Sequence, residues 1–365
     1  MALGKPAFEQ GPIRPPSEAL SLLLRFNRNC PWNRCLFCPV YKGKKFSRRS
    51  FAEIKQDILA VASAVEKIKE LSFRNGFGGN ITREVLALIK NDDSNMLSVA
   101  FWQYHGAETV FLQDGDALML PTVQLLELLR LLHEHLPGVK RITTYARSAT
   151  LLRRSAEELR QLKSAGLNRI HVGLESGHDP VLAYMQKGIT GAQHVAAGLK
   201  VKEAGMELSE YVILGLGGST MWRGHALDTA KALNAINPDF IRVRTLAIHP
   251  VSPLYGCFQQ GEFVPLNDEG VLREEKLLLE NLQGINSAFY SDHILNLLEE
   301  VCGQLPEDLA AMIEVIERYF ALSTPQRECF RLGRRTGYYR SLTDMENLPL
   351  AGVVENLYRQ LQKEG

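Results

Sequence analysis

The sequence has no long uninterrupted run of apolar residues. Its most leucine-rich stretch, LLELLRLLHEHL, is broken by charged residues well before the roughly 18 apolar residues that a membrane-spanning helix needs. The first residues, MALGKPAFEQ, also lack the basic and apolar segments of a secretory signal peptide. These absences predict a protein that does not cross a membrane and works in the cytoplasm.

An excess of charge of one sign is missing as well. With 42 Lys and Arg against 41 Asp and Glu, the net charge is +1, which gives no overall attraction for nucleic acid. Six cysteines in 365 residues do not make the disulfide framework of a small secreted protein. The length allows one large α/β domain with an appendage, or two domains.

Short runs rich in Val, Ile, Leu, Tyr and Thr alternate with segments of helical period. The predicted strands are 20–26, 108–113, 141–146, 169–174, 208–216 and 240–248, and the predicted helices are 50–71, 120–136, 155–166, 179–188, 191–205 and 225–237. Strands that alternate with helices indicate parallel βα units. Such units form either a doubly wound sheet or a partial (β/α)6 barrel of the TIM type.

The domain organisation follows from this pattern. We expect an N-terminal extension over 1–19, a partial barrel over 20–255 and a helical region over 256–365, with a helical insertion at 74–105. The β pattern is expected to stop after residue 250. Helices are predicted there over 265–285, 291–305 and 307–322.

Three cysteines follow the first predicted strand directly, in the stretch CPWNRCLFC. Cys30, Cys35 and Cys38 therefore lie at the carboxyl end of a strand, where α/β folds place their chemistry. A structural zinc site needs four ligands, and a fourth would have to come from one of the scattered cysteines. Three thiolates suit a 4Fe-4S cluster that leaves one iron open for a small molecule.

The cysteine spacing resembles that of the radical S-adenosylmethionine (SAM) enzymes, whose usual motif is C-x3-C-x2-C. Here the first spacing is C-x4-C, and the second is retained with the aromatic Phe37 before the last cysteine. The resemblance implies that Cys30, Cys35 and Cys38 hold a 4Fe-4S cluster whose open iron binds SAM. The additional residue indicates a changed path for the first part of the loop.

A second resemblance follows the fourth predicted strand. The stretch VGLESGHDPVLAYMQKGIT resembles the radical SAM branch that contains the oxygen-independent coproporphyrinogen III oxidases. It implies that Glu175 accepts a hydrogen bond from a ribose hydroxyl of SAM, and that Lys187 meets the methionine carboxylate. Both are suitable chemical partners. The alternative for Lys187 is an exposed lysine at a helix end.

The turn after the second predicted strand is Asp114-Gly115-Asp116. In the family this place usually holds a Gly-Gly-Glu turn that binds the amino group of methionine. The resemblance therefore implies the same contact for this turn, although it has one glycine in place of two. A simple tight turn is the alternative.

Further contacts with SAM are implied after the other strands. Gly215 and Gly217, in VILGLGG, and Ala247, after the last predicted strand, correspond to backbone that approaches the adenine. Tyr145 and Arg147 follow the third strand and are expected on the same side as the site, because side chains alternate along a strand.

The resemblance also implies a reaction. A flavodoxin or ferredoxin would supply one electron, SAM would be cleaved to methionine and a 5'-deoxyadenosyl radical, and the radical would abstract a hydrogen atom from a small-molecule substrate. The cofactor carries this chemistry under anaerobic conditions, and the protein orients and shields it.

Candidates for catalytic residues are few. His249 follows the last strand, His293 lies in Ser-Asp-His, and Cys257 could donate a hydrogen atom to a substrate radical. The Ser-Asp-His segment also resembles a further group of radical SAM proteins. Arg242 and Arg244 bind anions if they face into the barrel, but could equally lie outward under the helices.

Two other functions remain open. An RNA-modifying radical SAM enzyme would use the basic run over 41–49, although such a run is more often a solvated face. A non-catalytic protein that binds an iron-sulfur cluster or heme, as heme chaperones do, would agree with the altered turn and cysteine spacing.

Overall fold

The structure is a computed structural model that describes residues 7–89 and 94–364. Residues 1–6 of the predicted extension and 90–93 of the predicted insertion lie outside the described residues. The chain divides into two compact units. Unit 1 holds residues 1–33, 40–172 and 199–208, and unit 2 holds residues 34–39, 173–198 and 209–365. This division does not test the domain boundaries expected from the sequence, which remain a prediction.

The central feature is a sheet in the order β1-β4-β5-β6-β7-β8-β9-β10. Its strands are β1 (Leu22–Arg25), β4 (Thr109–Gln113), β5 (Arg141–Ala146), β6 (Leu167–Glu175), β7 (Glu207–Leu214), β8 (Phe240–Thr245), β9 (Ala288–Tyr290) and β10 (Cys302–Gln304). The pairs β1·β4, β4·β5, β5·β6, β7·β8 and β8·β9 are parallel. Parallel strands that alternate with helices confirm the α/β class and the strand order of a partial (β/α)6 barrel.

Two strands follow the six that the sequence predicts. β9 pairs with β8, and β10 pairs antiparallel with β9. The expectation that the β pattern stops after residue 250 was therefore wrong, as was the helix predicted over 291–305. The Asn296 side chain explains the difference, because it donates to the carbonyls of Val243 and Ser291, both at 2.9 Å. These bonds hold a turn where the apolar spacing indicated a helix.

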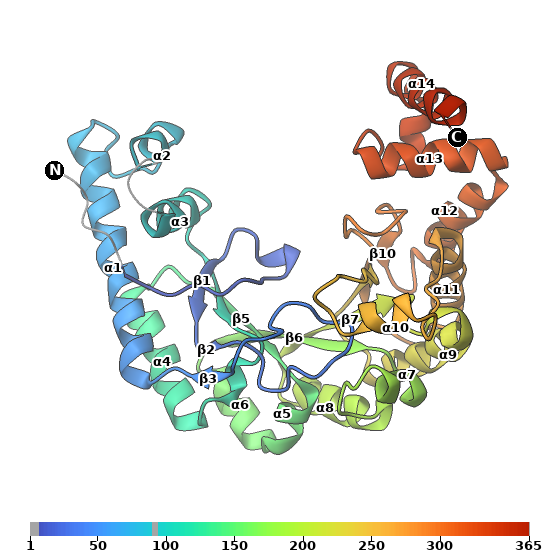
Figure 1. Ribbon diagram of the computed structural model, residues 1–365. Helices are drawn as coiled ribbons and strands as arrows, with labels where there is room; N and C mark the ends of the chain where they lie inside the picture. Colours follow the sequence, from blue (N-terminus) through green and yellow to red (C-terminus); the bar gives the residue numbers. More distant parts are fainter. Residues whose placement is uncertain (1–6, 90–93, 365) are drawn as a thin grey trace. The chain divides into compact units, whose positions relative to one another are not determined.

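Unit 1 covers its part of the sheet with helices. They are α1 (Phe51–Arg74), α2 (Arg83–Ile89), α3 (Ser94–Tyr104), α4 (Thr122–His135), α5 (Ser148–Arg153) and α6 (Ala156–Ser164), with short elements η1 (Pro16–Glu18), η2 (Ala117–Met119), β2 (Asn27–Arg28) and β3 (Ser47–Arg48). Helix α1 begins at a capping box between Ser50 and Glu53. It buries Ile54, Ile58 and Val61 at helical spacing and lies beside α4 (Figure 1).

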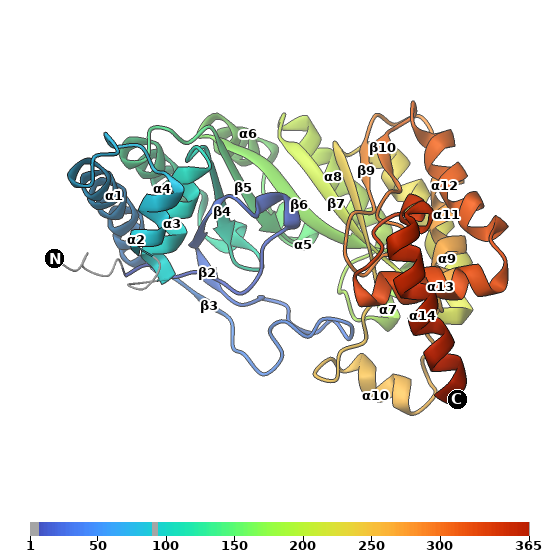
Figure 2. The same cartoon turned by 90° about the horizontal axis from the view of Figure 1, so that it is seen from above.

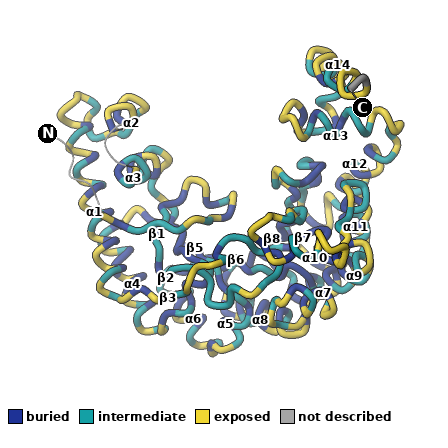
Figure 3. The backbone as a smooth tube through the Cα atoms, in the orientation of Figure 1, coloured by how far each residue is buried: buried dark blue, intermediate teal, exposed yellow. Residues whose placement is uncertain are grey.

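Unit 2 holds the remaining helices. They are α7 (Asp179–Tyr184), α9 (Gly218–Ile236), α10 (Leu254–Gln259), α11 (Asp268–Glu280), α12 (Leu309–Ala321), α13 (Thr324–Thr336), η3 (Leu342–Glu346) and α14 (Leu348–Glu364), while α8 (Gly191–Glu203) belongs to both units. After β10 the chain is helical, and α13 lies beside α14 (Figures 1 and 2). Figure 3 shows that exposed residues predominate along α14.

Neighbouring residues of α1 test this packing. Ile58 is fully buried, whereas Leu59 is 38% exposed. We expect Ile58→Ala to lower the free energy of unfolding by about 3 kcal/mol, because it leaves a cavity, and Leu59→Ala to lower it by less than about 1 kcal/mol. Chemical denaturation measures both values, and equal losses would contradict the assigned face of α1.

Candidate functional site

The three clustered cysteines lie in the loop after β1 and β2, as the sequence predicts. Cys30, Cys35 and Cys38 are partly exposed, and none forms a disulfide. Cys30 belongs to unit 1, and Cys35 and Cys38 belong to unit 2. Over residues 7–89 and 94–364 no ready-made group of three His, Cys, Asp or Glu side chains is in metal-binding range. The ligand set remains a prediction.

Asn33, one of the four residues between Cys30 and Cys35, forms hydrogen bonds that hold the loop. Asn33, within it, adopts a left-handed backbone conformation with φ 47°, which asparagine tolerates well. Its side-chain amide donates to the carbonyls of Tyr41 (2.6 Å) and Lys44 (3.2 Å), and Lys42 donates to the Asn33 carbonyl (2.9 Å). Asn33 thus braces the loop against the segment that follows it.

The turn Asp114-Gly115-Asp116 lies against this loop. A Cβ at Gly115 would be 3.2 Å from the Cys30 Cα, so any side chain there would press on the loop and glycine permits the close approach. Asp116 is fully buried and accepts a hydrogen bond from the Thr150 hydroxyl at 2.5 Å. Burial raises the pKa of this carboxyl to about 6. The turn therefore contacts the loop, as a site at this edge requires.

Glu175 and Lys187 form a pair within unit 2. The Lys187 Nζ lies 3.1 Å from Glu175 Oε1, and a Cβ at Gly173 would lie 2.2 Å from that oxygen. Only glycine at position 173 leaves room for the pair. Glu175 Oε2 is buried without a hydrogen-bond partner among the described residues. An open acceptor beside a cation fits the hydroxyls and the carboxylate of SAM.

The segment with Cys35 and Cys38 is held by two helices of unit 2. Phe37 is buried in a core with Met185 and Leu254. The Leu36 N–H donates to the Met185 carbonyl, and the Leu254 N–H donates to the Leu36 carbonyl, both at 3.0 Å. Lys187 Nζ lies 6.0 Å from the centre of the Phe37 ring, so the predicted aromatic position adjoins the predicted cation.

Cys257 contacts the same core from α10. It packs against the same apolar cluster as Cys35, Cys38 and Tyr184. The Tyr184 ring stacks on Phe263 at 6.2 Å between centres. The structure therefore brings this predicted thiol near two of the predicted cluster ligands.

The carboxyl end of β7 leads into Gly215, which is held by a hydrogen bond to α11. Gly215 has φ 78°, and its N–H donates to Glu274 Oε2 of α11 at 3.1 Å. Burial raises the pKa of Glu274 well above its usual value, and His225, whose Nε2 lies 3.0 Å from Glu274 Oε1, has its pKa lowered to about 4 by burial. Gly217 caps α9, where a Cβ would be 2.9 Å from the Met221 carbonyl carbon.

The other predicted contacts are more scattered. Tyr145 packs edge-to-face on Phe111, with ring centres 5.0 Å apart, in an aromatic group of unit 1. Arg147 lies over the Trp32 ring at 5.0 Å, so it contacts the cysteine loop. Ala247 follows β8 and is exposed.

The two candidate histidines both have local structural partners. The His249 Nδ1 accepts the Val251 N–H at 3.1 Å, and the His293 Nδ1 accepts the Leu295 N–H at 3.2 Å. His293 is half-buried, and burial lowers its pKa, with the charge of Arg244 acting in the same direction. At neutral pH His293 is therefore an uncharged imidazole.

The arginines of β8 lie on one face of that strand, by alternation. Arg242 is 9% exposed, lies over the Tyr290 ring at 4.5 Å and reaches Asp292 at 3.5 Å. Arg244 is exposed. The pair therefore puts positive charge next to the Ser-Asp-His segment.

Several buried carboxyl groups were not anticipated from the sequence, and three of them lie in unit 2. Glu274 and Glu275 come from α11, and Glu210 is 1% exposed in β7 with both oxygens unpaired among the described residues. Burial raises the pKa of Glu210 well above its usual value. One signal was available for Glu210, because a carboxylate within the apolar strand LSEYVIL is unusual in a core.

Comparison with known proteins finds a matching family model. The family model described as the Radical SAM superfamily matches residues 96–230. This range runs from α3 to α9 and includes Glu175 and Lys187. This part of the chain is therefore similar to the radical SAM superfamily. The cofactors of that superfamily, a 4Fe-4S cluster and SAM, are those that the cysteine spacing predicts here. The cysteine loop itself precedes the matched range.

Individual relatives match only in part. The heme chaperone HemW of Bacillus subtilis (strain 168) is 27% identical over 156 residues, which is 42% of this chain and 40% of HemW. A tRNA uridine(34) acetyltransferase of Methanocaldococcus jannaschii is 22% identical over 114 residues, 31% of this chain and 21% of its own. The chain therefore spans well under two thirds of the length of these curated relatives.

A solved structure of the superfamily is similar at a low level. Coproporphyrinogen III oxidase (HemN) from Escherichia coli has 16% sequence identity and a TM-score of 0.41, covering 68% of this chain and 50% of that one. Within residues 7–89 and 94–364, no helix has both the length and the apolar character that a membrane span needs.

Glu275 is buried and interacts with Ser291, so it allows a test of how the Ser-Asp-His segment is held. Burial raises its pKa to about 7, against a hydrogen bond from Ser291. A raised folded-state pKa means that stability is lost as the pH rises from about 4.5 to 7. This pH-dependent fall in the free energy of unfolding is up to about 3 kcal/mol. We expect it to be absent in Glu275→Gln, because an amide does not titrate.

Denaturant unfolding at several pH values measures this effect. Glu280→Gln, on the same helix but partly exposed, is the matched control and should keep the wild-type pH dependence. The same pH dependence in Glu275→Gln would show that Glu275 does not titrate in this way.

Proposed function

We propose that the protein is an enzyme that cleaves SAM reductively and uses the radical on a small-molecule substrate. The observation that supports this best is the Glu175–Lys187 pair. A buried oxygen of Glu175 is unpaired among the described residues, a cation lies 3.1 Å from its other oxygen, and both residues fall in the range of the family match. A structural ion pair has no need of an open acceptor.

In this proposal Cys30, Cys35 and Cys38 hold the 4Fe-4S cluster through their thiolates. When bound, the cluster would supply reductive chemistry, in which one electron from a flavodoxin or ferredoxin enters the sulfonium of SAM and breaks a carbon–sulfur bond to give methionine and a 5'-deoxyadenosyl radical. Glu175 orients SAM by accepting from its hydroxyls, and Lys187 neutralises its carboxylate. The backbone at Gly215, fixed by Glu274, gives the adenine a rigid surface.

The substrate side of the proposal uses unit 2. The substrate loses one hydrogen atom to the radical, which becomes 5'-deoxyadenosine, and the substrate keeps the unpaired electron. Arg242 and Arg244 favour a substrate with an anionic group, and uncharged His293 can accept a proton from it. Cys257 can return a hydrogen atom from its thiol, provided that an external reductant restores the thiyl radical that remains.

The central test is SAM cleavage. Anaerobically reconstituted and dithionite-reduced protein should release 5'-deoxyadenosine from SAM, and Cys35→Ala should lower the rate by at least about a hundredfold, because the cluster loses a ligand. Cys329→Ala, distant in sequence from the loop, is the control and should retain the rate. Chromatography of the nucleoside product measures both.

The same experiment separates the alternatives. A wild-type protein that takes up a cluster but releases no 5'-deoxyadenosine, with or without cell extract, would refute the catalytic proposal. Tight heme binding in that case would favour a function like that of HemW. Copurified RNA would favour RNA modification, the kind of function that the name of the Methanocaldococcus jannaschii relative indicates.

Lys187 allows a test of SAM binding itself. We expect Lys187→Met to weaken SAM binding about tenfold or more, because the carboxylate loses its charged partner, and Lys187→Arg to restore most of the affinity. Equilibrium dialysis with labelled SAM measures both. Lys231→Met, an exposed change on α9, should have no effect, and unchanged affinity in Lys187→Met would remove Lys187 from the site.

A further inference from the structure

One buried carboxylate connects the two ends of the cysteine loop. Asp114 is fully buried, and its Oδ2 accepts the Asn29 N–H at 3.3 Å, while its Oδ1 accepts the Tyr41 hydroxyl. Asn29 immediately precedes Cys30, and Tyr41 is the third residue after Cys38. The chain on both sides of the three cysteines is therefore bonded to one side chain.

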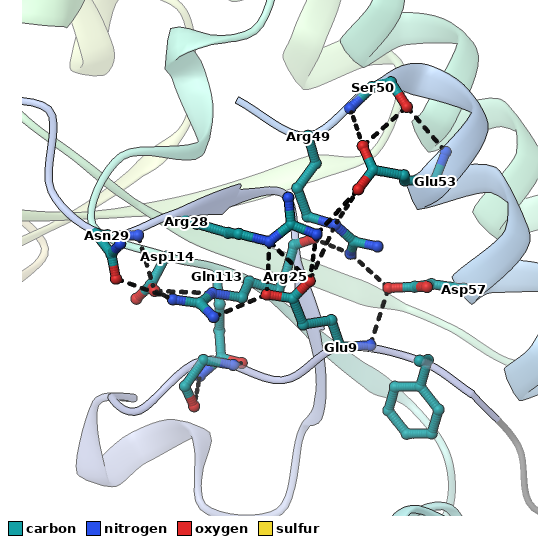
Figure 4. Close-up of polar contacts among 12 residues, drawn as sticks. Glu9, Arg25, Arg28, Asn29, Arg49, Ser50, Glu53, Asp57, Gln113 and Asp114 are labelled. Atoms are coloured by element: carbon teal, nitrogen blue, oxygen red, sulfur yellow. Dashed lines mark hydrogen bonds and ion pairs between the residues drawn. The ribbon is translucent and has the colours of Figure 1, made fainter. Parts of the chain in front are cut away.

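The carboxylate is itself held by an arginine. Arg25, the last residue of β1, donates to Asp114 Oδ2 through Nε (3.0 Å) and Nη2 (2.7 Å). The same Nη2 donates to the Asn29 side-chain oxygen at 3.2 Å. Figure 4 shows Arg25 between Asp114 and Glu9, with Asn29 next to the carboxylate. A rigid strand end is thereby joined to the start of the loop.

A second layer of charges fixes Arg25 in turn. Glu9 accepts from Arg25 Nη1 at 2.8 Å and from Arg28 Nη2 at 2.7 Å, and Arg28 also reaches Glu53 at 2.9 Å (Figure 4). Gly11 lies over the Asp114 carboxylate, where a Cβ would be 3.1 Å from its carbon. Buried charges are stable only in such fully paired arrangements.

Asn29, on the loop side of the contact, has a backbone conformation that few residues adopt. Asn29 has φ 70°, a left-handed backbone that most residues avoid. Its side-chain amide donates to the Lys45 carbonyl at 2.6 Å. The bonds of Asn29 to Asp114, Arg25 and Lys45 thus fix the backbone that leads into Cys30.

Both Asp114 oxygens are engaged within the protein, so the side chain has a use other than the SAM contact that the resemblance implies. A metal site gains affinity when its ligand loop is ordered before binding, because less conformational entropy is lost on binding. Three thiolates also repel one another, and a loop with free ends would separate them.

We propose that Asp114 is a positioning residue that fixes both ends of the cysteine loop, and so retains a 4Fe-4S cluster on Cys30, Cys35 and Cys38. The identity of the cluster rests on the proposed function. The ordering of the loop does not, because it is a property of the protein without a cluster.

The test compares Asp114→Asn with Asp57→Asn. Asp57 is the matched control, since it is 5% exposed and accepts from Arg49 (2.5 Å) and the Glu9 N–H (3.0 Å) in the same network, but has no bond to Asn29 or Tyr41. Each variant is measured at the same interval below its own Tm. A general loss of stability therefore affects both equally.

Two measurements are made on each variant. The first is the alkylation rate of Cys30 by iodoacetamide in the cluster-free protein, relative to Cys302 and Cys329 of the same chain, by mass spectrometry. The second is the rate at which reconstituted protein loses its absorbance near 410 nm to an iron chelator. We expect Asp114→Asn to raise both rates about tenfold, and Asp57→Asn to change them by less than about twofold.

Equal rates in the two variants would overturn the proposal. If wild-type protein takes up no cluster, the proposed function fails, whereas the alkylation rates still decide whether Asp114 orders the loop. If Asp114→Asn does not fold, Tyr41→Phe replaces it, since this change removes only the hydroxyl bond to the carboxylate. Tyr41→Phe should raise the Cys30 alkylation rate about threefold, and an unchanged rate would again overturn the proposal.

Discussion

The bonds of the buried Asp114 carboxylate determine the geometry of the unit 1 residues on both sides of the cysteine loop. Arg25 fixes the carboxylate to the end of β1, and Asn29 and Tyr41 fix the two ends of the loop to it. Such a carboxylate cannot be moved or left unpaired without a large cost. The proposed ligand set therefore begins from a backbone that is ordered by charge pairing, and the two N-terminal residues Glu9 and Gly11 complete that order.

In the part of the chain that the structure describes, the proposed site residues of unit 2 are not fully paired in this way. There the polar groups stay partly unsatisfied, because one oxygen of Glu175 is buried without a partner among the described residues while Lys187 lies at the other. The C-terminal helical region supports this side, since Glu274 of α11 holds the Gly215 turn. Rigid support around an open acceptor is the arrangement that a bound cofactor requires.

The sequence predicted the repeating units of the fold well, because each strand and helix carries its own period. β5, for example, has the predicted bounds. The prediction failed over 291–305, where Asn296 bonds back to β8 and to Ser291 and makes a turn of an apolar segment with helical spacing. No local pattern contains that information, since the bond joins residues about fifty positions apart.

By itself the sequence determined which residue types stand at the strand ends: three cysteines follow a first strand, and a Glu and a Lys follow a fourth. Their types and spacing predict the chemistry. Only the tertiary structure decided how these residues are held. Asp114 is one residue of a turn in the sequence, and it becomes a buried partner of Arg25, Asn29 and Tyr41 because parallel pairing of β1 with β4 brings their carboxyl ends together. Periodicity cannot specify which side chains meet at that edge.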